Sequence, residues 1–292
     1  MLVYEIIILL VVALSTIGLG MRVSLQDLVQ AFRDWDALIL VAAGQYLLMP
    51  LLTWLAIQAL DAPGETNLAI AVVLLGPGSE AGLVGVFLAR GNLPLAVIAI
   101  VMTNILSPLV APELISLIVA EQAATLAAAL PVFADIMAIV FLAIVAPFAI
   151  GMTIRQLTAH SWDVPDRSFR FFLWLAFLAN VIYAALAQAF EPPNIEVASN
   201  VSALAAIVAV TMLAFVLVYT LGRTFRVRPD CAVAASFIVS LQPIAVGLYV
   251  ASNLQGQMPV LTSLSIGYAM VLPFMIIVWI TVVGRRLPLA LR

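Results

Sequence analysis

The chain has 292 residues, of which 65% are hydrophobic and only 9% are charged. A soluble domain of this composition would expose far too much apolar surface, so the composition indicates an integral membrane protein whose surroundings are the lipid bilayer. The net charge is −3 and no basic tract is present, so no nucleic-acid partner is predicted. A single cysteine, Cys231, and a single histidine, His160, exclude a disulfide framework and a thiolate metal cluster.

Nine apolar segments follow one another along the chain, and a helix needs roughly 20 residues to cross the hydrocarbon core. The first segment lacks the basic residues that begin a cleavable signal peptide, so we expect it to be a span. The segments predict one all-α membrane domain over residues 1–292. The predicted transmembrane helices are at about 2–20, 37–60, 67–89, 92–119, 132–152, 169–190, 198–221, 231–253 and 258–284.

The basic residues all fall on one side of this pattern. All twelve are arginines, and every second loop contains none of them. Cytoplasmic loops retain arginine and lysine, whereas short translocated loops lose them. The distribution therefore predicts an outside N-terminus, a cytoplasmic C-terminus and an odd number of spans, in what we expect to be a bacterial inner membrane. The arginine-free loops are residues 61–66, 120–125, 191–197 and 253–257.

Residues 22–35, between the first two predicted spans, are polar but patterned. Apolar residues recur at helical spacing over 25–32, and Ser24 with Asp27 resembles an N-terminal capping pair. This pattern predicts a short helix that lies in the cytoplasmic interface.

The third and the eighth predicted spans are interrupted near their centres. The third reads LLGPGSEAGLVGVF, with Pro77 between glycines, and the eighth reads FIVSLQPIAVGL, with Pro243. Proline removes a backbone donor and glycine loosens a helix. The freed backbone groups must then be buried in protein or line a polar cavity. Interrupted segments at corresponding places in two halves are the best pointer in a sequence to a transporter site.

The order of the spans predicts an internal repeat. Spans one to four correspond to spans six to nine, and the fifth span is unmatched. Because the offset between the halves is an odd number of helices, the second unit runs inverted relative to the first. We therefore predict inverted repeats with two discontinuous helices that cross near the midplane, unwound over Gly76–Gly82 and Ser240–Gly247.

Glu80 stands at the centre of the first interruption. A carboxylate at mid-membrane is costly and is a functional hypothesis by default. Four roles are open for it: a protonatable coupling residue, a cation ligand, a partner of the substrate, or a neutral cap of the broken helix. The other candidate residues for binding substrate or ion are Gln45, Gly78, Ser79, Asn104, Ser240 and Gln242.

Four stretches resemble the bile acid:sodium symporter family. They are TIGLGMRVSLQDL (16–28), GQYLLMPLLTWLA (44–56), GPGSEAGLVGVFLARGNLPLAV (76–97) and SPLVAP (107–112). The resemblance implies a core domain, here spans two to four and seven to nine, that holds two crossed broken helices. It implies a panel of spans one, five and six that moves against the core. Because the chain begins at the family's first conserved stretch, we expect nine spans rather than the ten of other members.

The resemblance also implies two sodium sites at the crossing, and this chain departs from the first. The carboxylate of the second broken helix is replaced by Ile238, and the Ser-Asn pair of the first broken helix becomes Gly82 and Leu83. Of two hydroxyl ligands on the next helix, one falls at Ile100 and the other at Asn104. We expect the first sodium site to be lost.

The second sodium site is expected to keep its main components. Its predicted ligands are the side-chain oxygens of Gln45 and Gln242 and the main-chain oxygens of Ile238, Val239 and Leu241. A hard cation prefers several oxygens, usually including an anionic one, which Glu80 is placed to supply. Two alternatives stay open: Glu80 exchanges a proton, or coupling to an ion is lost.

The predicted function is a secondary active transporter of a small organic anion, without a cofactor and without enzymatic activity. One alternative is a related inverted-repeat carrier, of auxin-efflux or arsenite-efflux type; arsenite carriers use a cysteine where this chain has Gly76 and Ser79. Another is a non-transporting membrane sensor with this fold. A rhomboid-like protease needs a histidine within the membrane, and His160 falls in a predicted loop. The sequence predicts neither the substrate nor an oligomeric state.

Overall fold

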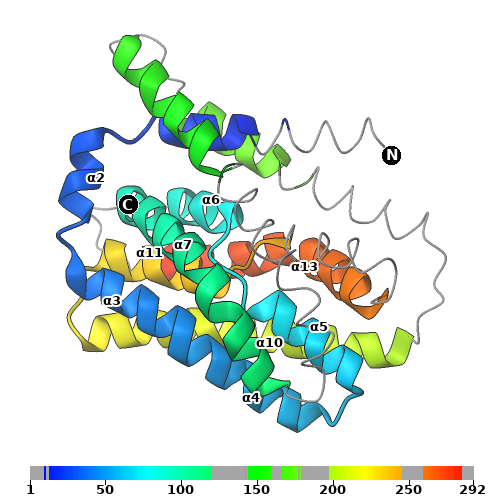
Figure 1. The fold of residues 1–292 in the computed structure, drawn as a ribbon. Coiled ribbons are helices and arrows are strands. Elements are labelled where there is room, and N and C mark those ends of the chain that lie inside the picture. Colours follow the sequence, from blue (N-terminus) through cyan, green and yellow to red (C-terminus); the bar gives the residue numbers. More distant parts are fainter. Residues whose placement is uncertain are drawn as a thin grey trace.

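The computed structural model describes residues 10, 13–119, 142, 144–158, 166–176, 178, 197–244, 247 and 259–284, with the backbone alone at 197–200 and 284. Within these ranges every regular element is helical, as the sequence predicts (Figure 1). Four of the described helices are long and apolar enough to cross a membrane: Trp35–Leu60, Leu93–Ile118, Val201–Thr224 and Pro259–Val283. Shorter apolar helices are Gly64–Leu74, Ile144–Leu157 and Pro229–Ser240.

Helix α2 (Leu25–Ala31) occupies the predicted interfacial segment. The Ser24 hydroxyl accepts a hydrogen bond from the Asp27 backbone N–H, and the Asp27 carboxylate accepts one from the Ser24 N–H, at 3.2 and 2.8 Å. This reciprocal capping box is the one that the sequence predicts. Three apolar side chains of the segment point away from the protein and are more than half exposed: Leu25, Val29 and Phe32.

The second predicted span is one continuous helix with an irregular turn at its centre. It consists of α3 (Trp35–Ala43), the π-helical turn η1 (Gly44–Leu48) and α4 (Met49–Leu60). Pro50 has no backbone N–H, so it cannot donate to the carbonyl four residues earlier. The π-helical turn η1 lies just before this proline and contains Gln45. Such turns are frequent at functional sites.

The third predicted span is broken, but over fewer residues than the sequence predicts. Helix α5 (Gly64–Leu74) ends before residues 75–79, which are not helical, and α6 (Glu80–Leu88) begins at once after them. The expectation that the chain is unwound as far as Gly82 is wrong. The reason is Ser79, whose hydroxyl caps α6 by accepting from the Gly82 N–H at 3.4 Å.

The second half repeats this order of long and broken helices. Helix α10 (Val197–Thr224) is followed by α11 (Pro229–Ser240) and by α13 (Pro259–Gly284), as α5 and α6 are followed by α7 (Leu93–Ile118). Helix α11 ends at Ser240, residues 241–243 are not helical, and helix resumes at residue 244. The expectation that Ser240–Gly247 is unwound is therefore wrong at both ends, because Ser240, Ile244 and Gly247 are helical. The remainder of the predicted span at 231–253 lies outside the described residues, apart from Gly247.

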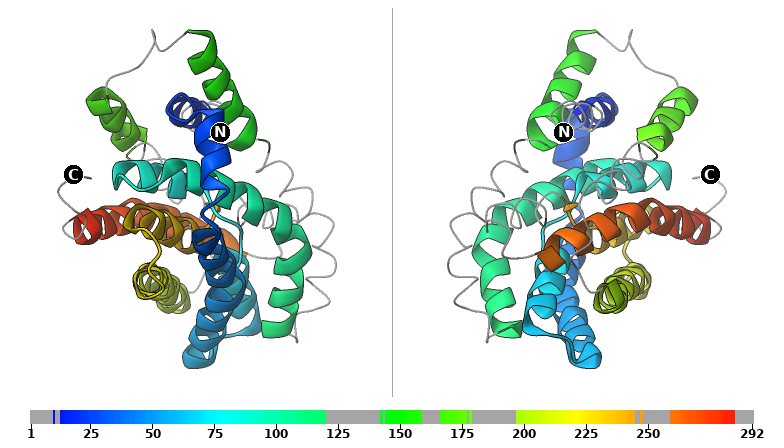
Figure 2. Two further views of the ribbon diagram at one scale, coloured as in Figure 1. Left: turned by 90° about the vertical axis from the view of Figure 1, so that its left-hand side faces the viewer. Right: turned by 90° about the vertical axis from the view of Figure 1, so that its right-hand side faces the viewer.

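Three further helices cover one side of this assembly. They are residues 13–20, Ile144–Leu157 and residues 166–176, which overlap predicted spans one, five and six. Figure 2 shows them together at one end of the molecule, with α3, α4 and α10 at the opposite end and α6, α7, α11 and α13 between. The division into a moving panel and a core stays a prediction.

The core helices pack around α10 and α11. Helix α10 lies against α11, α13 and α4, and α11 lies against α6, α7 and α3. Their contact surfaces are almost entirely apolar, and α11 is buried from Cys231 to Ser240. Because α11 is buried on every side, the neighbouring helices fix the position of its end at Ser240.

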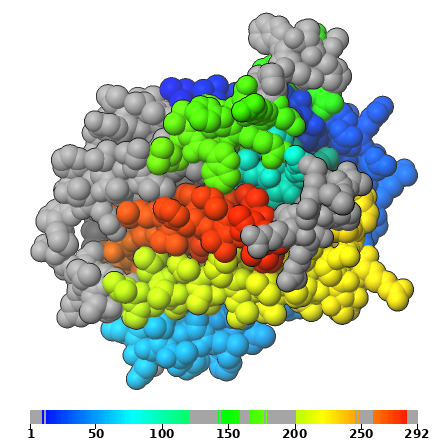
Figure 3. Space-filling model, turned by 180° about the vertical axis from the view of Figure 1, so that it is seen from behind, coloured from blue at the N-terminus to red at the C-terminus, as the bar shows by residue number. Residues whose placement is uncertain are grey.

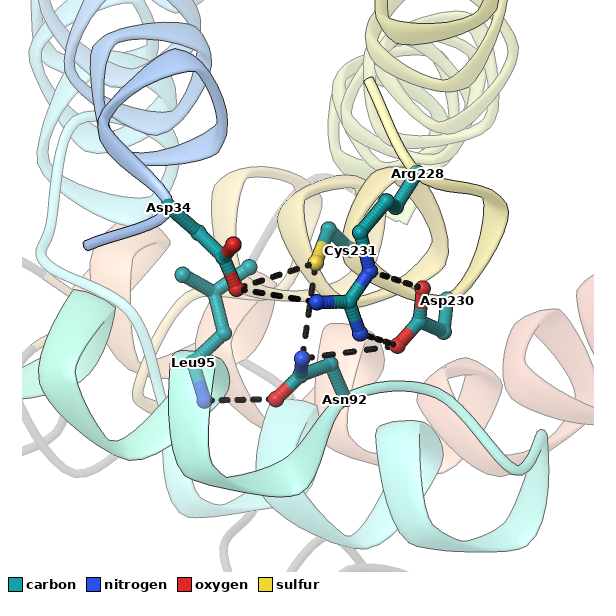
Figure 4. A network of polar contacts seen from close by, with 6 residues as sticks. All are labelled: Asp34, Asn92, Leu95, Arg228, Asp230 and Cys231. Atoms are coloured by element: carbon teal, nitrogen blue, oxygen red, sulfur yellow. Dashed lines mark hydrogen bonds and ion pairs between the residues drawn. The ribbon is translucent and has the colours of Figure 1, made fainter. Parts of the chain in front are cut away.

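A polar network joins the starts of α3, α7 and α11 (Figure 4). The Arg228 guanidinium bonds to Asp230 at 2.6 Å and pairs with Asp34 at 3.5 Å. Asn92 accepts from the Leu95 N–H, which caps α7, and its amide nitrogen donates to Asp230. In Figure 1 these helix starts lie on the same side as α2, so the network ties the core together at the side where the sequence places the arginines.

Candidate functional site

The two helix breaks lie against each other in the middle of the core. A methyl group at Gly76 would be 3.3 Å from Pro243 Cδ and 3.7 Å from Gln242 Oε1. At Gly78 it would be only 2.7 Å from Ile238 Cγ2 and 3.2 Å from the Ile238 carbonyl oxygen. Glycine at position 78 therefore lets the first break approach Ile238, at the end of α11, more closely than a residue with a side chain would.

Side chains from the neighbouring helices bind the backbone groups that the first break leaves free. The Gln45 amide nitrogen donates to the Gly76 carbonyl at 2.7 Å. The Asn104 amide nitrogen donates to the Gly78 carbonyl at 3.2 Å, and the Thr103 hydroxyl accepts from the Gly78 N–H at 3.2 Å. Buried backbone groups need such partners, because each unpaired one costs roughly a hydrogen bond.

The second break is held in a similar way. The Gln242 amide nitrogen donates to the Val239 carbonyl at 2.8 Å, and its backbone N–H donates to the Tyr268 hydroxyl at 3.4 Å. Gln242 is 1% exposed. Its side chain therefore bends back over the end of α11.

The geometry of these amides decides what their oxygens can do. Because each amide nitrogen donates to a carbonyl, the oxygen of the same amide must point elsewhere. Within the described residues, the side-chain oxygens of Gln45, Asn104 and Gln242 are buried without a hydrogen-bond donor, and so is the Ser240 hydroxyl. An unsatisfied buried acceptor costs about 1–3 kcal/mol. Several of these atoms belong to residues in or beside the two touching breaks.

A neighbouring part of the crossing is apolar. Ile238, Leu83 and Ile100 are at most 1% exposed. The Ile238 side chain occupies the space beside Gly78 and Gly82, whose added methyl groups would lie 2.7 and 3.0 Å from its carbons, and Ile100 borders Gly78 as well. This part of the contact is therefore packed hydrocarbon.

Glu80 differs in position from the amides. It is the first residue of α6 and is partly exposed, whereas the neighbouring Ser79 is 1% exposed. A carboxylate in the first turn of a helix lies at the positive end of the helix dipole, which stabilises negative charge. The arrangement puts a titratable group at the edge of the break.

The structure thus brings Gln45, Gly78, Asn104 and Gln242 to one place, and puts Ser79 and Ser240 at the helix ends that border it. The predicted main-chain ligands Ile238, Val239 and Leu241 lie on the second break or just before it. Two partners were not among the predicted site residues. Thr103 and Tyr268 bind the backbone of the breaks; both are polar residues in apolar spans, which is the signal that could have pointed to them.

Comparison with known proteins identifies the family to which the chain belongs. The family model described as "Sodium Bile acid symporter family" matches residues 7–196. The chain belongs to the sodium bile acid symporter family. The match includes the first broken helix and the following helix with Asn104, and ends before α10, so the second broken helix lies outside it. Membership identifies an integral membrane protein of a transporter family, as the sequence predicts.

One curated relative is similar over part of the chain. It is an uncharacterised sodium-dependent transporter, YocS, of Bacillus subtilis (strain 168), 33% identical over 147 residues. The aligned region covers 49% of this chain and 44% of the relative, so the chain spans less than half of that protein's length.

Proposed function

We propose that this protein is a sodium-coupled secondary transporter of a small organic anion, with one cation site at the contact of the two helix breaks. The observation that carries the proposal is the set of buried amide oxygens without donors around Gly76 and Gly78. Family membership and the sodium-dependent relative support the choice of sodium.

The proposed cation site lies beside both breaks, with ligands from the second break, from the end of α11 and from Gln45, which is hydrogen-bonded to the first break. Gln45 Oε1 and Gln242 Oε1 would face the ion from either side of Gly76. Main-chain oxygens of Ile238, Val239 and Leu241 would complete the shell. The Val239 carbonyl accepts from Gln242 and keeps a second lone pair for a ligand. Because Gln45 is hydrogen-bonded to Gly76 of the first break and the other ligands belong to the second break or the end of α11, binding of the ion would hold the breaks together.

One cation, rather than two, follows from the apolar cluster. Ile238, Leu83 and Ile100 would stand where the family resemblance implies the first sodium site, and hydrocarbon offers no ligand to a hard cation. We therefore propose a stoichiometry of one sodium ion, with a sodium dependence that is hyperbolic rather than sigmoidal.

Glu80 would connect the ion to the substrate. The N-terminus of a half-helix attracts the acidic group of an anionic substrate, but in α6 the Glu80 carboxylate already occupies that end. An anion could bind there only when Glu80 is neutralised, either by a proton or by a nearby cation. This competition is a physical route to coupling, with alternating access by movement of the panel (residues 13–20, Ile144–Leu157 and 166–176) against the core.

The experiment is uptake into proteoliposomes that contain the purified full-length chain. A panel of radiolabelled organic anions is offered with an inward sodium gradient or with an equal potassium gradient. We expect sodium-driven accumulation of at least one anion, with a Hill coefficient for sodium near 1. Specific anion binding with no uptake under either gradient would instead favour the membrane sensor. Uptake driven by a proton gradient alone would favour Glu80 as the coupling group over the amide site.

A further inference from the structure

A hollow of about 760 Å³ opens between the turn that follows α6 and the helix 166–176. Arginines line it from both sides: Arg90 in the turn, and Arg167 and Arg170 in the first two turns of the helix. Figure 3 shows the helices of the 144–176 region (green) against the α6–α7 region (teal). The hollow therefore lies across the boundary between two groups of helices.

The negative charge at this hollow is already paired. Asp166 also lines it, but its carboxylate accepts from Arg22 Nε at 3.4 Å. Arg22 lies outside the hollow, with its guanidinium 3.9 Å from the centre of the Phe169 ring. Within the part of the chain that the structure describes, no carboxylate comes within 4.0 Å of the three lining arginines. The hollow thus presents three arginines against one carboxylate, Asp166, which is shared with Arg22, so its net charge is positive.

One of the three arginines is held in place. Arg170 Nη1 donates to the Leu88 carbonyl at the end of α6, at 3.0 Å, and the guanidinium lies 4.8 Å from the centre of the Phe87 ring. Phe87 in turn packs edge-on against Phe169, at 5.3 Å between ring centres. A guanidinium has five N–H donors, so this anchoring leaves donors for a phosphate and removes part of the entropy cost of binding one.

The surface that leads away from Arg167 is apolar. Phe171 and Leu175 follow it at intervals of four residues, on one face of the helix, and are 71% and 53% exposed. They begin an apolar row that also includes Leu178, which is 54% exposed. From Arg167 to Leu175 the helix rises about 12 Å, which is most of the roughly 15 Å of hydrocarbon in one leaflet. A cationic hollow followed by an apolar row of this length suits a phospholipid.

We propose that Arg90, Arg167 and Arg170 bind the headgroup phosphate of an anionic phospholipid, whose acyl chains lie along the row from Phe171 to Leu178. Basic pockets between helices on the cytoplasmic side are suited to such headgroups. The bound lipid would join the α6–α7 turn to the helix 166–176 and stabilise this arrangement of the two. The inference concerns lipid binding alone and does not depend on the transported substrate.

The test is a titration of the purified full-length protein in neutral detergent, read by its thermal unfolding midpoint. Phosphatidylglycerol, phosphatidylcholine of the same acyl length, and inorganic phosphate are compared. We expect phosphatidylglycerol to raise the midpoint at the lowest concentration. Arg90→Gln/Arg167→Gln should weaken its apparent affinity about thirtyfold, because each arginine near an anionic lipid contributes roughly fivefold. Arg33→Gln, which removes an exposed arginine of the same side, should leave the affinity unchanged.

Several outcomes decide against the proposal. Equal effects of the two lipids, or wild-type affinity in the double variant, would overturn it. A midpoint raised as much by inorganic phosphate as by phosphatidylglycerol would make this a site for a free anion and overturn the lipid assignment. If the double variant does not fold, Arg167→Gln alone is measured, with an expected weakening of about fivefold; an unchanged affinity overturns the proposal equally.

Discussion

The proposed cation site makes a quantitative prediction about sodium and stability. An ion that binds only the folded protein stabilises it by RT ln(1 + [Na⁺]/Kd), about 2.7 kcal/mol at a hundredfold excess over Kd. In Gln45→Leu and Gln242→Leu, the side chain loses its amide group and with it the oxygen that would face the ion. Each variant should lose most of this sodium-dependent term.

The variants also change stability without sodium, and that effect must be separated. Gln45→Leu removes the hydrogen bond to the Gly76 carbonyl, which leaves a buried acceptor unpaired at a cost of about 1–3 kcal/mol. Asn67 provides a matched control, because its amide nitrogen donates to the Ala62 carbonyl and its oxygen is also buried without a donor. Asn67 lies nine residues before Gly76, about 13 Å away along a helical rise. Asn67→Leu should lower basal stability while keeping the full sodium shift.

The assay is thermal unfolding of the purified protein in sodium chloride and in potassium chloride at equal ionic strength. Sodium should raise the unfolding midpoint of the wild type and of Asn67→Leu, and have little effect on Gln45→Leu and Gln242→Leu. The reasoning is refuted if the wild type does not distinguish sodium from potassium. It is refuted as well if both glutamine variants keep the whole shift.

Four further predictions follow from other parts of the molecule. Glu80→Gln should abolish the pH dependence of uptake without loss of folding, because no other group would titrate at the start of α6; a pH profile equal to the wild type would contradict this role. Gly78→Ala should lower the free energy of unfolding by about 1–3 kcal/mol, because the added methyl group would lie 2.7 Å from Ile238. The double variant Gly78→Ala/Ile238→Ala should recover part of this loss. An unaltered unfolding midpoint in Gly78→Ala would refute the close contact. Ser24→Ala should destabilise the protein by about 1 kcal/mol. The Ser24 hydroxyl lowers the pKa of Asp27 below its ordinary value of 3.8. The stabilisation that Ser24 gives the ionised carboxylate should therefore be present above pH 3.8 and disappear as the pH falls through the lowered pKa. Acid denaturation curves of the wild type and Ser24→Ala measure this difference. A reporter fused to the C-terminus should behave as cytoplasmic, and a periplasmic signal would exclude the predicted orientation.

The linear sequence was sufficient for the positions of the long helices that the structure describes. The described helices Trp35–Leu60, Leu93–Ile118 and Pro259–Gly284 agree with the predicted spans to within a few residues. The reason is that a membrane helix satisfies its own backbone hydrogen bonds, so an apolar run specifies it without reference to the rest of the chain. The same local logic located both breaks, since Pro77 and Pro243 remove donors wherever they stand.

The lengths of the breaks and the chemistry of the site depended on tertiary structure. The cap by Ser79 shortens the first break, and the second break ends at residue 244. The direction in which an amide oxygen points depends on which carbonyl accepts a hydrogen bond from the amide nitrogen. For Gln45 that carbonyl is at Gly76, 31 residues away in the chain. Composition and periodicity show that a polar group is buried, but its free atoms are decided only when helices from different parts of the chain pack together.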